Sequence, residues 1–226
     1  MAEPVREVVT IDGPAGVGKS TISRRVASQL GYTYLDTGAM YRAVAWYLQK
    51  NHVDIDNESA VAAALRKIVL KLLPSEHEDD DVGVLLNGED ISSLIRTPEM
   101  SMLASSASAL PAVRDKLTAM QREAGENGNI VAEGRDTGTV VFPDARHKFF
   151  LDASPAARAA RRARQLRERG EDVDEKKLLE MTIARDRQDR ERAIAPLKKA
   201  EDAALVDTTD LSIDQVLETV LKTIRR

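Results

Sequence analysis

The residues best suited to do chemistry form one run near the N-terminus, Gly13 to Ser20, which reads Gly-Pro-Ala-Gly-Val-Gly-Lys-Ser. The run fits the pattern G-x-x-x-x-G-K-[S/T], whose glycines let backbone N–H groups close around phosphate oxygens. An apolar run precedes it and a helix-compatible segment follows, so the N-terminus of that helix adds positive potential. We expect Lys19 to reach the β and γ phosphates of ATP and Ser20 to ligate Mg²⁺.

This loop predicts ATP binding but not the acceptor, because kinases, GTPases, ATPases and motor proteins share it. Its predicted ATP-binding residues are Gly13, Pro14, Ala15, Gly16, Val17, Gly18, Lys19, Ser20 and Thr21. A glycine-rich turn with a stray lysine is the alternative, and the strand-loop-helix context disfavours it. The arginines elsewhere in the chain narrow the choice of acceptor.

Two segments place an arginine directly after a short apolar run. In the first, residues 35–42, a glycine turn leads into a helix that presents Arg42 one turn from its start. Alone, this segment is explained slightly better as an ordinary turn with a solvated arginine. In the second, residues 132–138, two glycines bracket Arg135 and Asp136. Glycines that permit close backbone approach beside such an arginine favour a functional turn over a structural one.

A third set of charges lies on a predicted helix over about residues 174–194. Its first half has a core face made by Leu178, Leu179 and Ile183. Its second half has none, so we expect that burial does not hold that half in place. Arg185, Asp189 and Arg192 fall at i, i+4 and i+7 and can point at one object together. The alternative is a self-satisfied Arg185–Asp189 pair on a solvated helix.

The fourth segment is a predicted helix with Ser154 as its cap, Pro155 in its first turn and Gly170 at its end. Its basic residues are all arginines: Arg158, Arg161, Arg162, Arg164, Arg167 and Arg169. Arginine offers a bidentate fork, which favours phosphate contacts. RNA binding is the competing interpretation. The lack of aromatic residues between the arginines and the net charge of -4 disfavour it.

Together these clusters favour a reaction that brings two phosphate-bearing molecules end to end. Such molecules repel each other, and the charge that develops on the transferred group needs compensation at several points. The chain shows no recognisable catalytic-base motif near the loop. A monophosphate with a second pKa of about 6 is already a competent nucleophile at neutral pH, so a phosphate acceptor needs no general base.

Five short apolar runs would position these residues: 8–11, 32–35, 130–132, 148–151 and 204–206. They are continuous rather than alternating, which is typical of strands buried on both faces of a parallel sheet. Each ends at an acidic residue: Asp12, Asp36, Glu133, Asp152 and Asp207. In a parallel sheet these ends gather on the edge where open α/β sheets bind ligands. Asp152 and Asp207 are expected only to mark turns or helix starts.

The strand-helix alternation breaks in the middle of the chain. We expect a helix over about residues 58–72, an acidic loop over 76–81 that is a solvated tip, and a hairpin that turns at Asn87-Gly88. This pattern predicts an inserted antiparallel subdomain. At the other end of the chain, the last helix should be purely structural, with a capping box made by Ser212 and Gln215.

The composition fits one compact α/β domain. With 226 residues, 42% of them hydrophobic, the chain can bury a substantial core. It has no cysteine and only three histidines, widely spaced, which excludes disulfides, thiolate zinc sites and His-based metal clusters. No stretch approaches the ~20 apolar residues that span a bilayer. We therefore expect a cytoplasmic protein with no membrane partner.

The motifs taken together resemble those of bacterial cytidylate kinases over nearly the whole chain. They are the phosphate loop from Ile11, Leu35-Asp-Thr-Gly-Ala-Met-Tyr-Arg42, Glu133-Gly-Arg-Asp-Thr-Gly-Thr-Val-Val-Phe-Pro-Asp144 and Arg185-Asp-Arg-Gln-Asp-Arg-Glu-Arg192-Ala-Ile-Ala-Pro-Leu197. The last two are much more specific than the loop. The resemblance implies transfer of the ATP γ-phosphate to CMP or dCMP with Mg²⁺. We expect a monomer that binds no nucleic-acid polymer.

The resemblance also implies a fold and its parts. We expect an α/β P-loop kinase with a central five-stranded parallel sheet flanked by helices, an inserted antiparallel monophosphate-binding subdomain and a helical lid. The single domain would have its core over about residues 1–50, 118–153 and 195–226. The insert would cover about 51–117 and the lid about 154–194.

The family's site residues carry over as follows. The acceptor phosphate would be held by Arg42, Arg135 and Arg192. The sugar hydroxyls would be reached by Arg185 and Asp189. Cytosine would be read by Ser105, Arg114 and Asp136. Among the lid arginines, those facing ATP would be Arg158, Arg161 and Arg162.

Three further assignments complete the expected site. Thr37 stands where the family also has serine, keeps the hydroxyl, and is counted with the substrate-binding residues. Glu133 stands where relatives often have aspartate and would hold Mg²⁺ through water. The groups expected to act directly in catalysis are Lys19, Arg135, Arg162 and Arg192.

Two other functions remain open from the sequence. A kinase for another small molecule, with a sugar-acid or shikimate-like hydroxyl as acceptor, would need a carboxylate base, and Asp36 is a candidate. A non-enzymatic nucleotide sensor would bind nucleotide without turnover.

Overall fold

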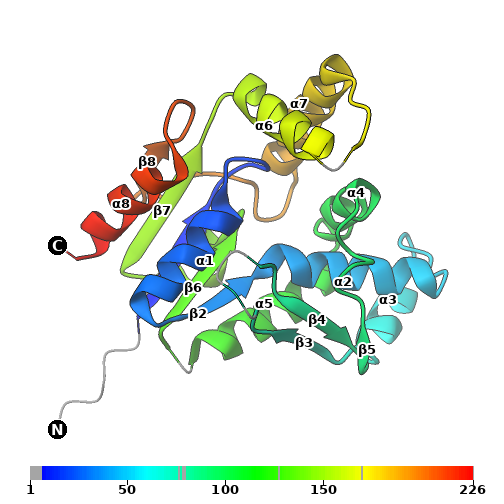
Figure 1. Ribbon diagram of the computed structural model, residues 1–226. Coiled ribbons are helices and arrows are strands. Elements are labelled where there is room, and N and C mark those ends of the chain that lie inside the picture. The colour runs from blue at the N-terminus through cyan, green and yellow to red at the C-terminus, as the bar shows by residue number, and fades with distance from the viewer. Residues whose placement is uncertain (1–6, 76, 78–79, 127, 169, 226) are drawn as a thin grey trace, which may run out of the picture.

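The fold is built around a parallel sheet that was expected from the five apolar runs (Figure 1). The computed structural model describes residues 7–75, 77, 80–126, 128–168 and 170–225. Within these residues, five strands form one sheet in the order β2-β6-β1-β7-β8, with every neighbouring pair parallel. The strands are β1 (Val8–Asp12), β2 (Thr33–Asp36), β6 (Ile130–Gly134), β7 (His147–Asp152) and β8 (Ala204–Asp207). The five predicted strands are confirmed.

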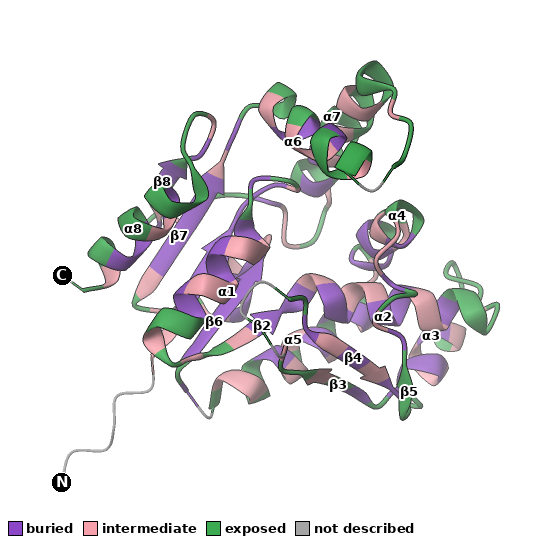
Figure 2. Ribbon diagram, in the orientation of Figure 1, coloured by how far each residue is buried: buried purple, intermediate pink, exposed green. Residues whose placement is uncertain are grey.

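Helices cover both faces of this sheet, and the burial of its strands explains their continuous apolar runs. The covering helices are α1 (Lys19–Leu30), α2 (Thr37–Lys50), α5 (Pro111–Glu126) and α8 (Ile213–Ile224). Along β6, Ile130 and Ala132 belong to the hydrophobic cluster that contains α2 and α5, whereas Val131 belongs to the cluster that contains α1 and α8. Figure 2 shows β6 and most of β7 as buried.

The carboxyl ends of the strands gather on one edge, as the pattern of acidic residues predicts. Asp12 pairs in register with Gly134, and Asp36 with Glu133. At the far side of the sheet, Asp152 accepts a hydrogen bond from the N–H of Ala153 and Asp207 from that of Thr209, both at 2.9 Å. These last two acids therefore shape turns, as expected.

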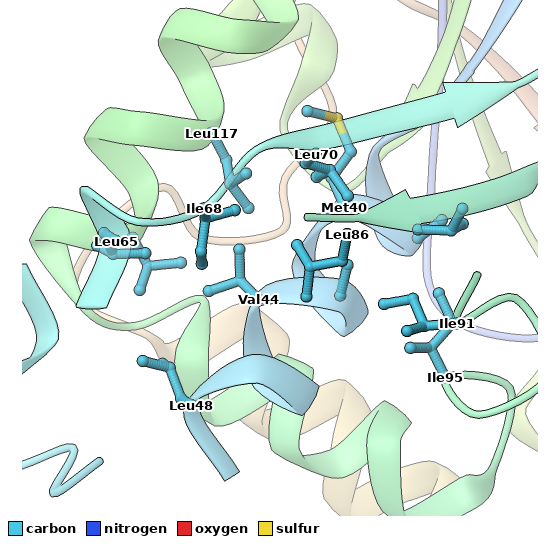
Figure 3. Close-up of a cluster of buried hydrophobic side chains, with 14 of the residues drawn as sticks. Met40, Val44, Leu48, Leu65, Ile68, Leu70, Leu86, Ile91, Ile95 and Leu117 are labelled. Carbon is cyan, nitrogen blue, oxygen red and sulfur yellow. The ribbon is translucent and has the colours of Figure 1, made fainter. Parts of the chain in front are cut away.

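The middle of the chain forms the predicted antiparallel insert. Its elements are α3 (Glu58–Leu65), β3 (Leu70–Leu73), β4 (Gly83–Leu86), β5 (Glu89–Asp90) and α4 (Pro98–Ala107). The strands form one sheet in the order β3-β4-β5. Asn87 and Gly88 have φ values of 51° and 84°, which suit a two-residue hairpin turn. Figure 3 shows how Leu70 and Leu86 of this sheet pack on Val44 of α2.

Two expectations for the insert were wrong. The helix ends at Leu65 rather than near Leu72, because Leu70–Leu73 pairs with β4. The sequence of this segment alone does not reveal that pairing, because β4 follows only after an intervening loop. The acidic loop is not simply a solvated tip either, since Asp81 forms ion pairs with Arg24 of α1 and, at 2.8 Å, with Arg96. The other acidic residues of that loop, Glu76, Glu78 and Asp79, lie outside the described residues, while Asp80 is exposed.

The arginine-rich segments form α6 (Pro155–Glu168) and α7 (Glu175–Glu191), which pack on each other (Figure 1). The expectation that the second half of α7 lacks a buried face was wrong, because Asp186 and Asp189 are buried there by ion pairs with Arg158 and Arg135. Conversely, Ile183 does not join a core and is 44% exposed. Arg169 lies outside the described residues. No helix of the described part of the chain is long and apolar enough to cross a membrane.

The capping box of α8 is formed as predicted and supports a stability test. Ser212 Oγ accepts from the N–H of Gln215 at 3.2 Å, and the Gln215 side chain accepts from the N–H of Ser212 at 2.9 Å. Ser212→Ala should destabilise the protein by about 1 kcal/mol, because it removes one of these bonds. Urea unfolding followed by circular dichroism measures this. Thr223→Ala on the same helix removes a hydroxyl that plays no part in capping and should change stability by less than about 0.5 kcal/mol.

Candidate active site

The phosphate loop connects β1 to α1 and depends on its glycines. Gly13, Gly16 and Gly18 have positive φ values of 150°, 80° and 93°. A Cβ on Gly13 would also lie 2.1 Å from the carbonyl oxygen of Leu151 on β7. Gly18 occupies the N-cap position of α1, so the loop ends where the free N–H groups of that helix begin. This geometry suits the binding of an anion.

Lys19 begins α1 and is held in a buried position beside the loop. It is 7% exposed, and its Nζ donates to the carbonyl oxygen of Pro14 at 2.8 Å rather than to a carboxylate. Burial, followed by the charge of Arg135, lowers the pKa of Lys19 to about 7. An incoming phosphate would provide the negative charge that favours the ammonium form. The arrangement is therefore suited to a polyphosphate ligand.

Glu133 lies at the end of β6 with its two carboxylate oxygens in different surroundings. Its Oε1 accepts from Ser20 Oγ at 2.7 Å and from the Tyr34 hydroxyl at 2.6 Å. Its Oε2 is buried and has no hydrogen-bond partner among the described residues. Burial, followed by the charge of Asp36, raises the pKa of Glu133.

These oxygen donors fit the predicted Mg²⁺ site. Mg²⁺ is usually held by one or two carboxylates together with water and substrate phosphates. Within the described residues no group of three or more His, Cys, Asp or Glu residues could hold a metal ion. The residues present, Ser20 and a carboxylate with one unpartnered buried oxygen, match an ion that is bound jointly with a nucleotide.

The start of α2 brings Asp36, Thr37 and Arg42 to the same edge of the sheet. Asp36 caps the helix by accepting from the N–H of Ala39 at 2.7 Å, and its other oxygen pairs with Arg42 at 3.3 Å. Thr37 Oγ1 donates to the carbonyl oxygen of Glu133 at 2.6 Å. Because both oxygens of Asp36 have these structural roles, Asp36 is poorly suited to act as a base toward an alcohol.

Arg135 and Arg185 lie near Arg42 and form a concentration of positive charge around Asp189. Arg135 Nε donates to Asp189 Oδ2 at 2.8 Å. Burial alone would raise the pKa of Asp189, but the charge and hydrogen bond of Arg135, together with the charges of Arg185 and Arg192, outweigh it and lower that pKa. Burial, followed by the charge of Arg135, lowers the pKa of Arg185 to about 10.

Two of these arginines keep unpartnered donors. The Nε atoms of Arg42 and Arg185 are buried and have no hydrogen-bond partner in the described part of the chain. Arg185 therefore does not form the self-satisfied pair with Asp189 that was the alternative, because Asp189 is bonded to Arg135 and, at 3.2 Å, to Ser105 of α4. Buried guanidinium donors that lack partners suit an anionic ligand.

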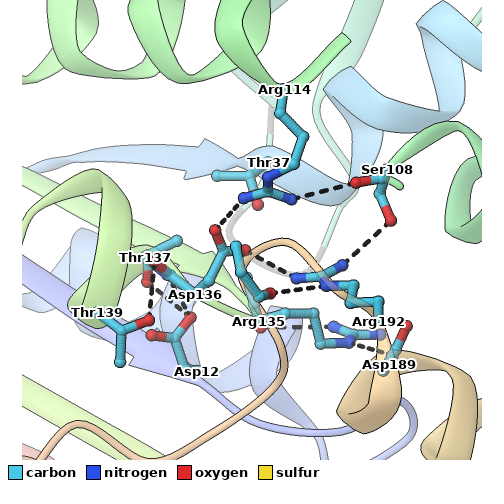
Figure 4. Close-up of polar contacts among 12 residues, drawn as sticks. Asp12, Thr37, Ser108, Arg114, Arg135, Asp136, Thr137, Thr139, Asp189 and Arg192 are labelled. Carbon is cyan, nitrogen blue, oxygen red and sulfur yellow. Dashed lines mark hydrogen bonds and ion pairs between the residues drawn. The ribbon is translucent and has the colours of Figure 1, made fainter. Parts of the chain in front are cut away.

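A second network surrounds Asp136, the residue directly after Arg135 in the chain (Figure 4). Its two oxygens accept from Arg114 of α5 and, at 3.2 Å, from Arg192 at the end of α7. Arg192 also donates to Ser108 Oγ at 3.1 Å. Thus α5, the turn after β6 and the end of α7 each contribute a residue to one network.

The glycines that bracket Arg135 and Asp136 also have a structural explanation, and the functional role expected of this turn stays a prediction. A Cβ on Gly134 would lie 2.8 Å from Thr37 Oγ1, and one on Gly138 would lie 2.8 Å from Thr10 Oγ1. Asp12 accepts from the N–H groups of Thr137 and Gly138 at 2.9 and 2.7 Å, which draws this turn onto β1. Internal packing therefore requires these glycines.

Two arginines of α6 contact the phosphate loop, one by a direct hydrogen bond to its backbone and one through Thr208. Arg158 is 2% exposed, forms a two-point ion pair with Asp186 and donates to the carbonyl oxygen of Ala15 at 3.0 Å. Arg161 donates to Thr208 Oγ1 at 3.2 Å, and Thr208 Oγ1 donates to the carbonyl oxygen of Val17 at 3.2 Å.

The outer arginines of α6 make local contacts. Arg162 Nη1 donates to Gln165 at 3.4 Å, and the exposed Arg167 pairs with Glu175 of α7. Contact of Arg158, Arg161 and Arg162 with ATP stays a prediction.

Several polar residues of the site carried no sequence signal that identified them. They are Tyr34, Ser108, Asp186 and Thr208. Each takes part through a partner more than 25 positions away in the chain, so spacing could not reveal it. Hydrogen bonds and ion pairs link most of the residues predicted around the acceptor, at the carboxyl edge of the sheet.

Comparison with known proteins places this site in a family. A family model described as cytidylate kinase matches residues 9–226. A cytidylate kinase from Carboxydothermus hydrogenoformans is 47% identical over 218 residues, 96% of this chain and 97% of that protein. One from Nitratidesulfovibrio vulgaris (strain Hildenborough) is 50% identical over 220 residues, 97% of this chain and 93% of that protein.

A solved structure supports the fold. It is a shikimate kinase from Bacteroides thetaiotaomicron, 13% identical, with a TM-score of 0.50 over 98% of this chain and all of its own. That likeness confirms the kinase fold but gives no information about the acceptor. The extent of the family match and the identity to curated relatives decide the assignment: the chain belongs to the cytidylate kinase family.

Proposed function

We propose that this chain transfers the γ-phosphate of ATP to CMP or dCMP and releases ADP with CDP or dCDP. As a member of the cytidylate kinase family it is an ATP-dependent nucleoside monophosphate kinase. One observation supports a phosphate-bearing acceptor. Arg42, Arg135 and Arg185 lie together at the edge of the sheet beside the phosphate loop. The Nε atoms of Arg42 and Arg185 are buried and have no hydrogen-bond partner among the described residues. A nucleoside monophosphate would satisfy those donors, that of Arg42 through its phosphate and that of Arg185 through its sugar hydroxyls.

In this proposal the arginines replace a general base. Arg42, Arg135 and Arg192 hold the acceptor phosphate, whose second pKa of about 6 leaves it largely ionised at neutral pH. Because each phosphate repels the other, the guanidinium groups bring the attacking oxygen into line and compensate the developing charge. The ion pairs with Asp136 and Asp189 hold Arg192 and Arg135 in place before substrate binds.

On the donor side, the loop from Gly13 to Thr21 binds the ATP phosphates, and Lys19 neutralises charge on the transferred group. Ser20 and Glu133 would hold Mg²⁺, Glu133 through water. When bound, this ion neutralises charge on the β and γ phosphates. Arg158, Arg161 and Arg162 act from the lid, over about residues 154–194.

The remaining assignments concern the nucleoside. Arg185 and Asp189 reach the sugar hydroxyls, and cytosine is read by Ser105, Arg114 and Asp136. The bonds from Ser105 to Asp189 and from Arg114 to Asp136 support this grouping, since they link the proposed sugar and base contacts within one network. The insert over about residues 51–117 would supply the monophosphate-binding surface. A monomeric state and a cytoplasmic location stay predictions.

An acceptor panel tests the proposal. ADP release from ATP and Mg²⁺ should be stimulated by CMP and dCMP at kcat values within the usual enzymatic range of about 1 to 10³ s⁻¹, and not by shikimate. AMP and UMP define the selectivity for the base. Stimulation by shikimate alone would support a hydroxyl kinase. Nucleotide binding without ADP release in the presence of any pyrimidine monophosphate would favour the sensor.

A further inference from the structure

We propose that Tyr34 is a positioning residue that fixes which oxygen of Glu133 faces the Mg²⁺-nucleotide site. The inference rests on the proposed function, because it assigns a task to Glu133 within it. The described hydrogen bond of the Tyr34 hydroxyl goes to Glu133 rather than to the phosphate loop, so Tyr34 is not proposed to bind the nucleotide. It acts through the hydrogen bond from its hydroxyl to Glu133 Oε1, at 2.6 Å.

The sheet register explains how Tyr34 reaches Glu133. Asp36 of β2 lies directly opposite Glu133 of β6, and Tyr34 lies two residues earlier on the same strand. Residues two apart in a strand point to the same face, so Tyr34 is the diagonal neighbour of Glu133. A long aromatic side chain spans that diagonal. The sheet therefore holds the phenol at a fixed distance from the carboxylate.

The two hydroxyls make the carboxylate asymmetric. Tyr34 and Ser20 both donate to Oε1, at 2.6 and 2.7 Å, while Oε2 stays buried without a partner in the described residues. With the phenol removed, Glu133 could rotate and share its oxygens differently with Ser20, because the glutamate side chain has several rotatable bonds. The phenol thus keeps Oε2 as the oxygen left available for a cation or its water.

Groups that orient a metal-binding carboxylate affect affinity without touching the metal. Loss of such an outer hydrogen bond typically weakens metal binding by about 10 to 100-fold. The ring of Tyr34 should stay in place when its hydroxyl is removed, since it packs against both hydrophobic clusters of the domain. Tyr34→Phe therefore removes the hydrogen bond and leaves the ring packing.

Tyr32 provides a matched control. Its hydroxyl donates to Glu7 Oε2 at 2.7 Å, so it forms the same kind of tyrosine-glutamate bond away from the site. Both tyrosines also line a cavity of about 560 Å³ between α1, β2, β3 and α5. Tyr32→Phe therefore removes one tyrosine hydroxyl from the lining of the same cavity.

The experiment measures Mg²⁺ binding to the enzyme saturated with ADP by calorimetry. Tyr34→Phe should weaken this binding about tenfold, with ADP affinity in EDTA changed less than about twofold. Tyr32→Phe should leave both unchanged. In a Glu133→Gln background, Tyr34→Phe should have little further effect on Mg²⁺ affinity, because the two residues act through one bond.

The outcomes separate this inference from the proposed function. Unchanged Mg²⁺ affinity in Tyr34→Phe, or an equal loss in Tyr32→Phe, would overturn the positioning role. An additive loss in the Glu133→Gln background would do the same. Failure of the wild-type protein to phosphorylate any pyrimidine monophosphate would instead reject the proposed function, while the calorimetric result on Tyr34 would still stand.

Discussion

Lys19→Ala should lower kcat for phosphoryl transfer to CMP by about 10² to 10³-fold, the usual cost of removing one preorganised electrostatic group from an active site. The expectation follows from the surroundings of the ammonium. It is buried beside the loop, and its hydrogen bond goes to a carbonyl oxygen rather than a carboxylate. Its charge is therefore available to compensate the charge of the transferred phosphate.

Steady-state rates at saturating ATP and CMP measure the loss, and circular dichroism shows whether the variant is folded. Lys222→Ala is the matched control, because that lysine is exposed on α8 and, within the described residues, forms an ion pair with Glu218 of its own helix at 2.7 Å. It should keep the wild-type rate. If Lys19→Ala also kept that rate while folded, the loop would lose its proposed catalytic role.

The central sheet could be predicted because its signal is local. Strands buried on both faces need continuous apolar runs, and each of the five runs supplied one strand. The phosphate loop was equally visible, since its glycines and lysine stand at fixed spacing. By contrast, β3 follows a short helix and reads as its continuation until its partner β4 is known.

The charged helix α7 shows a different limit of sequence reasoning. Arg185, Asp189 and Arg192 were expected on a common face, yet Arg192 follows the last residue of α7 and has an extended backbone. The periodicity of apolar residues indicated no buried surface in this half of the helix. In the fold, Asp186 and Asp189 are buried because Arg158 of α6 and Arg135, directly after β6, neutralise them. A burial pattern sustained by ion pairs is invisible to hydrophobic periodicity, since the partners come from distant segments.

The grouping of the acceptor residues was anticipated mainly through the family resemblance. Spacing alone could not bring Ser105 of α4 to Asp189 of α7, or Arg114 of α5 to Asp136. Each of these contacts joins two segments that are separate along the chain: α4 and α7 in one case, α5 and the turn after β6 in the other. The resemblance supplied the set of residues, and the fold supplies the ion pairs that preorganise it.

Arg135→Ala should lower kcat/KM for CMP by about 30 to 5,000-fold, because truncating one partner of a buried, hydrogen-bonded charge pair usually costs about 2 to 5 kcal/mol. Two losses combine in this variant. The acceptor phosphate loses a guanidinium contact, and Asp189 loses the partner that lies 2.8 Å from it. Arg135→Lys should recover only part of the activity, because lysine keeps the charge but not the planar fork.

The same variant separates the acceptor from the donor. ATP affinity measured without CMP should change less than about threefold in Arg135→Ala, because the proposed contact is with the acceptor phosphate. Arg187→Ala, an exposed arginine on α7, is the control and should leave both constants near their wild-type values. A large loss of ATP affinity with an unchanged KM for CMP would move Arg135 to the donor side. The arginines around Asp189 would then no longer identify a phosphate acceptor.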